Sequence, residues 1–240
     1  MLAIPQILCA TLIAFIAPGK VMGAGPGLYS ASGKPALDDV GVSNVDAVKF
    51  GAIIQAMADY DPKEVSGMIK AVDQGQYEVT FPTHLVNAES NDRAGSLFLV
   101  PQPSSVAERL RWSAKALWPY VVAKGYEMFN TAKDALRCDD VHSCMYDIVQ
   151  YQTQQTSPEQ FGNQATGFKR GSGIKVLATT SQAKKLKANY AYALLSYDSA
   201  KKTVELSDPT EGAGKPVVKK LEDVQADIQA VFEAITPSKV

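Results

Sequence analysis

The chain has 240 residues, of which 46% are hydrophobic and 20% are charged, and its formal net charge at pH 7 is -1. These values are ordinary for a globular protein, and they exclude a disordered chain, a collagen-like repeat and a basic nucleic-acid binder. A chain of this length can form a core as one domain or as two small lobes.

The first 24 residues have the pattern of a secretion signal. Leu2 to Ala17 is almost wholly apolar, and small residues follow from Val21 to Gly25. The apolar run is shorter than the ~20 residues that span a bilayer, which favours a signal peptide at residues 1–24, although no Lys or Arg precedes it. A hydrophobic N-terminal anchor is the alternative. With cleavage, we expect a secreted, extracellular protein that does not contact the membrane.

Helices are expected in the part that follows a flexible, Gly-, Ser- and Pro-rich lead-in at residues 25–35. Asn44 can cap a helix from Val45 to Tyr60, because the apolar residues of this stretch recur at helical spacing. Pro62 fits the first turn of a second helix that ends near Val72. Tyr77 to Phe81 alternates like a strand.

A longer helical stretch is expected from Val106 to Lys133, and Pro119 should divide it into two helices because proline removes a backbone donor. Residues 154–173 are polar and weakly patterned, which is typical of a connection. Three strands are expected at Ile174–Thr179, Tyr190–Tyr197 and Thr203–Leu206, and the last two should form a hairpin. A helix from Val217 to Ile235 would close the chain. The predicted fold class is therefore α+β, helical first and rich in antiparallel strands second.

Three segments of the chain share the order and spacing of one enzyme family. They are Asp39-Val40-Gly41 through Asp46-Ala47 to the strand Gly75–Phe81; Leu117-Trp118-Pro119-Tyr120 to Tyr126; and Asn189-Tyr190-Ala191-Tyr192 with Val204-Glu205-Leu206-Ser207-Asp208-Pro209. Over residues 36–236 they resemble the papain-like catalytic domain of calpains, which are cysteine proteases. The resemblance implies a two-lobed papain-like fold, with a helical lobe at 36–153, a β-rich lobe at 154–240 and a peptide groove between them.

The catalytic residues of that family are replaced in this sequence. A papain-like site needs a Cys at a helix start, where the helix dipole lowers the thiol pKa, and a His oriented by an Asn. The resemblance places Ala47 at the Cys position, Tyr190 at the His position and Asp208 at the Asn position, with Gly41 near the oxyanion-hole Gln. No cysteine lies between Cys9 and Cys138, and no histidine follows His142, so no shift of the alignment restores either residue. We expect the Tyr190 hydroxyl to fill the space of the missing thiol, bonded to the helix-start amides or to Asp208.

The expected function is that of a secreted calpain-like pseudoprotease, a non-catalytic monomer that binds a protein or peptide ligand in the interlobe groove. The alternatives are an active cysteine-type endopeptidase or other hydrolase that uses unrecognised residues, and a structural protein whose groove has closed. No cofactor is required. Some calpain domains bind calcium through loop carboxylates, for which Asp38, Asp39, Asp208 and Glu211 are candidates without an assignment.

Cys138 and Cys144 are the two cysteines that remain after signal cleavage removes Cys9. With His142 between them they could bind a metal, but their spacing matches no standard zinc pattern, and secretion favours a disulfide. A relocated catalytic dyad of Cys138 and His142 is a weaker alternative, because nothing orients the imidazole. The cluster Lys184-Lys185-Leu186-Lys187 is expected to be a solvated loop.

Overall fold

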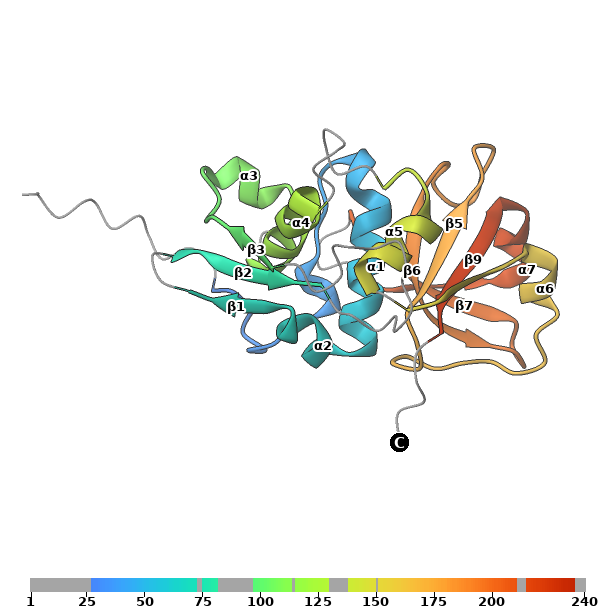
Figure 1. Ribbon diagram of the computed structural model, residues 1–240. Coiled ribbons are helices and arrows are strands. Elements are labelled where there is room, and N and C mark those ends of the chain that lie inside the picture. The colour runs from blue at the N-terminus through green and yellow to red at the C-terminus, as the bar shows by residue number, and fades with distance from the viewer. Residues whose placement is uncertain are drawn as a thin grey trace, which may run out of the picture.

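The computed structural model describes residues 27–72, 75–81, 97–113, 115–129, 138–149, 151–210 and 215–235. Within them the fold is α+β, with two antiparallel sheets on opposite sides of a central helix (Figure 1). This class and the antiparallel strands agree with the sequence prediction. The proposed signal peptide lies outside the described residues.

The central helix is α1 (Val48–Tyr60), and it follows the 3₁₀ turn η2 (Val45–Ala47) that Asn44 caps. The Asn44 side chain accepts a hydrogen bond from the Asp46 amide at 3.0 Å, which confirms the expected helix start. Nearly all residues of α1 are buried, as in a helix covered on all sides. The remaining helices and turns are η1 (Leu37–Asp39), α2 (Pro62–Gly67), α3 (Val106–Leu110), α4 (Trp118–Phe129), α5 (Val141–Val149), α6 (Pro158–Gly162), α7 (Leu221–Val224) and η4 (Gln225–Asp227).

The smaller sheet has the strand order β1-β2-β3 and packs against α4. Its strands are β1 (Ile69–Ala71), β2 (Tyr77–Thr80) and β3 (Leu97–Val100). The strand expected at Tyr77–Phe81 is β2. Gly125 lets α4 approach this sheet, because a side chain on Gly125 would come within 2.8 Å of Val79.

The larger sheet has six strands in the order β4-β9-β5-β6-β7-β8, all antiparallel to their neighbours. The strands are β4 (Thr153–Thr156), β5 (Lys175–Thr179), β6 (Ala191–Asp198), β7 (Thr203–Ser207), β8 (Val217–Lys220) and β9 (Ile228–Ala234). The three strands expected from the sequence are β5, β6 and β7, and β6 and β7 form the expected hairpin. Lys202 in its turn has a φ of 52°, the left-handed conformation typical of tight turns.

Two hydrophobic clusters cover the two faces of this sheet. On one face, small residues such as Ala191 and Ala193 join the cluster of α1, α4, α5 and the small sheet. On the other, Tyr192 and Leu194 pack with Phe161 of α6. The alternation along β6 therefore separates small residues, which let α1 come close, from large residues that cover the outer face.

The helix expected at Val217–Ile235 is wrong. This stretch contains β8, the short helix α7, the turn η4 and β9. The residues of β9, Ile-Gln-Ala-Val-Phe-Glu-Ala, suit a helix by propensity, but β9 pairs with β4 on one side and β5 on the other. The backbone hydrogen bonds to β4 and β5 outweigh the helix propensity of these residues.

Three other expectations need correction. The stretch from Val106 is not divided at Pro119: α3 ends at Leu110, and α4 begins at Trp118 with Pro119 in its first turn, where its missing amide costs nothing. The second helix, α2, ends at Gly67 instead of near Val72, and the residues after it form β1. The polar residues 154–173 contain most of β4 and all of α6, which Ser157 and Gln160 cap reciprocally.

Candidate functional site

Tyr190 and Asp208, which the resemblance gives to the catalytic His and Asn, contact each other directly. Tyr190 precedes β6 and Asp208 follows β7, and the antiparallel pairing of these strands brings them to the same end of the sheet. The Tyr190 hydroxyl donates to Asp208 Oδ1 at 2.6 Å. Both residues are buried.

Thr210 and Lys187 complete this cluster, and the sequence analysis assigned a role to neither. The Thr210 amide and hydroxyl both donate to Asp208 Oδ1, at 2.9 and 2.8 Å, and the hydroxyl lies 2.8 Å from that of Tyr190. Lys187 Nζ donates to Asp208 Oδ2 at 2.6 Å and lies 4.9 Å from the centre of the Tyr190 ring. The Asp-Pro-Thr sequence was a usable signal for Thr210, because Asp often binds the backbone two residues on. No sequence signal indicated Lys187.

The position of Lys187 depends on the loop that precedes it. The amides of Lys184, Lys185 and Leu186 all donate to the Asp227 carboxylate, at 2.9, 2.5 and 2.7 Å. This loop was expected to be solvated, and its lysines are exposed. The Lys187 ammonium nevertheless reaches the Asp208 carboxylate, because Asp227 fixes the backbone just before it.

Tyr190 and Asp208 are held in opposite protonation states. Burial, and then the hydrogen bond to Asp208, raise the pKa of the Tyr190 phenol well above its ordinary value of 10. Burial alone would raise the pKa of Asp208, but the hydrogen bonds from Lys187, Tyr190 and Thr210 outweigh it and hold that pKa below its usual range. At neutral pH Tyr190 is therefore a protonated donor and Asp208 an ionised acceptor. A protonated phenol of this kind cannot act as a general base.

Ala47 lies where the resemblance predicts, at the start of α1. It is the last residue of η2 and the N-cap residue of α1, and it is buried. The amides around it are used locally: those of Asp46 and Ala47 donate to Asn44, and that of Val48 donates to Val45. The expected bond from these amides to Tyr190 is therefore not formed. Val48 packs in the same hydrophobic cluster as Tyr190.

Gly41 begins an extended segment that joins the helical part to the end of β7. Its amide donates to the Trp112 carbonyl at 2.9 Å, and the Val42 amide donates to the Pro209 carbonyl at 2.7 Å. A side chain at Gly51 in α1 would come within 2.9 Å of the Pro209 side chain. The fold therefore brings the Gly41 segment and the first turns of α1 next to the Asp208–Pro209 turn.

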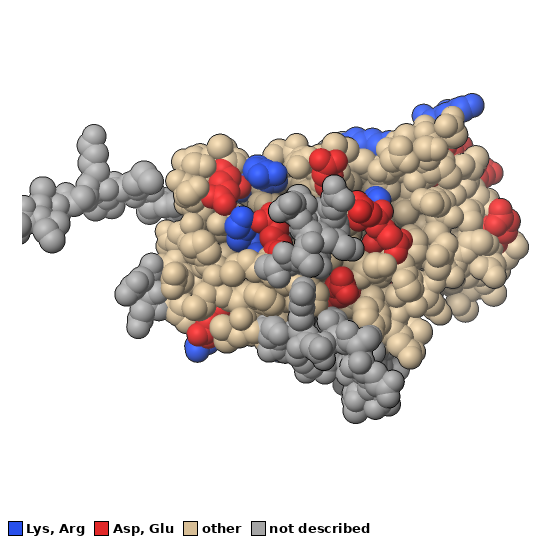
Figure 2. Space-filling view, turned by 45° about the horizontal axis from the view of Figure 1, so that its top comes forward, with Lys and Arg blue, Asp and Glu red and all other residues tan. Residues whose placement is uncertain are grey.

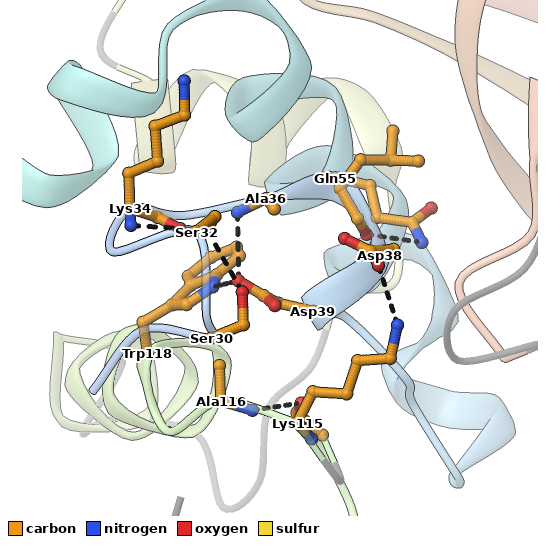
Figure 3. Close-up of polar contacts among 12 residues, drawn as sticks. Ser30, Ser32, Lys34, Ala36, Asp38, Asp39, Gln55, Lys115, Ala116 and Trp118 are labelled. Carbon is orange, nitrogen blue, oxygen red and sulfur yellow. Dashed lines mark hydrogen bonds and ion pairs between the residues drawn. The ribbon is translucent and has the colours of Figure 1, made fainter. Parts of the chain in front are cut away.

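The segment before Gly41 is anchored by Asp39, which is buried (Figure 3). Asp39 Oδ2 accepts from Trp118 Nε1 at 2.7 Å and from the Ala36 amide at 3.0 Å. The Trp118 amide in turn donates to the Leu28 carbonyl at 2.9 Å. Trp118 is thus both a fully buried core residue and the donor that holds Asp39 in place.

The carboxylates considered for calcium are engaged with protein donors. Asp38 pairs with Lys115 at 2.7 Å, and Asp39 and Asp208 bind the groups already described. Glu211 lies outside the described residues. Among the residues that the structure describes, no group of three His, Cys, Asp or Glu side chains is placed to hold a metal ion. On the face in Figure 2, acidic and basic side chains are interspersed.

Cys138 and Cys144 form a disulfide, with their Cα atoms 5.5 Å apart. Both are buried, and Cys144 lies on α5 with its sulfur 3.5 Å from the Tyr126 hydroxyl. The expected pairing is confirmed, and the sulfurs are not available as metal ligands or as a nucleophile. His142, between them, approaches the Thr153 carbonyl at 3.4 Å.

Comparison of the chain with protein-family models and with curated proteins gave no match. The calpain resemblance therefore rests on the residues quoted in the sequence analysis. Among the described helices, none has the length and apolar character needed to cross a bilayer.

Proposed function

We propose that this chain is a secreted calpain-like pseudoprotease, a papain-like two-lobed protein that binds a protein or peptide ligand without cleaving it. The observation that carries the proposal is the closed hydrogen-bond cluster of Tyr190, Asp208, Thr210 and Lys187. Two of its residues, Tyr190 and Asp208, are those that the resemblance gives to the base of a papain-like enzyme and to the group that orients that base.

The chemistry of the site supports a non-catalytic role. Alanine at position 47 offers no nucleophile, and the phenol at position 190 stays protonated at neutral pH. The amide of Gly41, near the position of the oxyanion donor, is already bonded to a backbone carbonyl. Each of the three functions that peptide hydrolysis needs is therefore missing or occupied.

The same cluster is suited to holding a rigid surface. Asp208 receives hydrogen bonds from three residues, and a buried polar network of this kind fixes one arrangement of its loops. A rigid surface binds a peptide at a lower cost in conformational entropy than a mobile one. The ligand, in this proposal, lies across the Asp208–Thr210 turn and the start of α1.

The first test is for catalysis. The secreted protein is incubated with a quenched fluorescent peptide library and with casein, with and without calcium, beside the variants Ala47→Cys and Ala47→Cys/Tyr190→His/Asp208→Asn. We expect no cleavage by the natural chain. Cleavage that Ala47→Cys alone restores would overturn the proposal, because it would show that a base is already in place.

The second test is for binding. Labelled extended peptides from the same library are titrated with the protein, and affinity is followed by fluorescence polarisation. We expect Lys187→Ala to weaken binding at least about tenfold, because it removes a charge beside the proposed contact surface. Lys201→Ala, in the turn between β6 and β7, is the matched control and should bind as the natural chain does. Equal affinities for the two variants would show that the peptide does not bind beside Lys187, which contradicts the proposed contact surface.

A further inference from the structure

A second site lies on the far side of the large sheet from α1. A cavity of about 350 Å³ is bounded by β4, β5, β9, α6 and the loop that follows α6. Phe161, Phe168 and Val231 form an apolar wall, and Thr156, Gln164 and Lys175 add polar groups. This volume is at the lower end of the range for small-molecule pockets, roughly 300–1,000 Å³, and fits an amino-acid-sized ligand.

Lys175 is an unusual residue at this position. It begins a strand in which every residue is buried, and its own exposed fraction is 7%. Lysine is almost never fully buried without a partner. Its partner is Glu233, which stands directly opposite on β9 and forms an ion pair with it.

The pair leaves bonding capacity on the lysine. An ammonium group has three N–H donors, of which Glu233 takes one, and the group lies 4.9 Å from the centre of the Phe168 ring. Burial lowers the pKa of Lys175 to about 8, which indicates that its positive charge is incompletely compensated. A ligand carboxylate beside Nζ would supply that compensation.

Glu233 presents the opposite charge at the same place. Its Oε2 accepts from Gln154 Nε2 at 3.3 Å, and its side chain is 31% exposed, so it can be reached from the opening of the cavity. Lys175 and Glu233 are the titratable groups among the described lining residues. The cavity therefore offers one cation and one anion side by side, with an aromatic wall next to them.

The walls are held in place without a ligand. Phe168 exchanges two backbone hydrogen bonds with Tyr197 of β6, at 2.9 and 3.0 Å. A side chain at Gly167 would come within 2.1 Å of the Tyr197 carbonyl, so the loop lies directly on the strand. Gln225 Nε2 donates to the Pro158 carbonyl at 3.2 Å and fixes the start of α6. Such preorganisation lowers the cost of binding.

We propose that this cavity binds a free α-amino acid with an apolar side chain, its carboxylate on Lys175 and its ammonium on Glu233. Only a free amino acid carries both charged groups on one carbon, whereas a peptide separates them along its length. The side chain would lie against Phe161 and Phe168. This site is separate from the Tyr190–Asp208 cluster, so the proposal does not depend on the proposed function.

The test is isothermal titration of the full secreted chain with phenylalanine and leucine. Two capped probes, N-acetylphenylalanine and phenylalanine amide, each lack one of the two charges. We expect free amino acids to bind with a Kd of ~10 µM–1 mM, as is usual for ligands of about ten heavy atoms, and each capped probe to bind at least about tenfold more weakly.

Variants separate the site from the rest of the surface. Lys175→Met and Glu233→Gln should each weaken phenylalanine binding at least about tenfold. Lys70→Met, which breaks an exposed ion pair with Glu78 on the small sheet, should leave it unchanged. If Lys175→Met fails to fold by circular dichroism, Glu233→Gln and the capped probes still decide the question. Equal binding of free and capped phenylalanine, or no heat from either free amino acid at about 10 mM, overturns the proposal.

Discussion

Replacing Tyr190 with Phe should destabilise the protein by about 2 kcal/mol. The variant keeps the ring, with its contact to the Lys187 ammonium, and removes only the hydroxyl that donates to Asp208. A hydrogen bond to a charged group contributes about 1.5–3 kcal/mol. We expect a loss in the lower half of that range, because Lys187 and Thr210 continue to satisfy the carboxylate.

The measurement is urea unfolding, followed by circular dichroism with the disulfide intact. Tyr197→Phe is the matched control, because Tyr197 is also buried, but its hydroxyl accepts a hydrogen bond at 3.2 Å from the ammonium of Lys202, an exposed lysine that water can solvate in its place. We expect that control to lose less than about 1 kcal/mol, because interactions of exposed charged side chains contribute little to stability. If the two variants lose the same free energy of unfolding, the hydrogen bond from Tyr190 to Asp208 contributes no more to stability than the one between Tyr197 and Lys202, and the prediction is wrong.

The pH dependence gives an independent check. The pKa of Asp208 is lower in the folded state, so its stabilisation is complete above the unfolded pKa of about 3.9 and is lost as pH falls through the folded pKa. The pKa of Tyr190 is raised, so its contribution is complete below pH ~10 and declines as pH rises above that value. The difference between the natural chain and Tyr190→Phe should therefore be largest between about pH 5 and 9 and smaller at both extremes. A difference that stays constant down to pH 3 contradicts this account.

Three further predictions concern the scaffold. Replacing Cys138 and Cys144 with Ser should lower the free energy of unfolding by about 2 kcal/mol, the value expected for so short a loop, and the natural chain should show no free thiol at these positions by mass spectrometry. Trp118→Phe should cost about 2–3 kcal/mol in urea unfolding, because it leaves a buried carboxylate without its indole donor; no measurable loss would show that this bond is dispensable. Gly51→Ala should lower the free energy of unfolding by about 1–3 kcal/mol, because its new methyl group would come within 2.6 Å of Val42 and 2.9 Å of Pro209. Gly67→Ala, with open space around it, should be neutral or stabilising, and the reverse order would contradict the packing.

The strands that the sequence predicted correctly are those whose surroundings match their local pattern. β5, β6 and β7 are continuous apolar or alternating runs bounded by turn residues, so local pattern and final environment agree. β9 was missed for the opposite reason. Its Gln, Ala and Glu residues favour a helix locally, and its strand state depends on partners up to about eighty positions away in the chain. β8, which pairs with its neighbour β7, was included in the same helix although its two valines favour a strand.

The candidate site could be predicted only where a family pattern existed. Ala47, Tyr190 and Asp208 were named from that pattern, and the bond between the last two was among those expected. Lys187 could not be predicted, because its place depends on a carboxylate forty residues later that fixes its loop. Lys175 was missed because a lysine within a predicted strand is usually exposed, and only the sheet register shows Glu233 opposite it.

The position of β9 has a consequence for how the chain acquires its structure. β9 is the last strand in sequence, yet it lies inside the sheet, between β4 and β5. Until residues 228–234 have left the ribosome, β4 has no partner and one edge of β5 stays open. Until then β4 and β5, two of the three strands that bound the cavity, are not joined, and the Lys175 ammonium has no carboxylate opposite it. The small sheet, by contrast, uses residues 69–100 alone and can form while the rest is still being made. A chain that ended before residue 228 would expose two unpaired strand edges, the kind of surface that leads to aggregation.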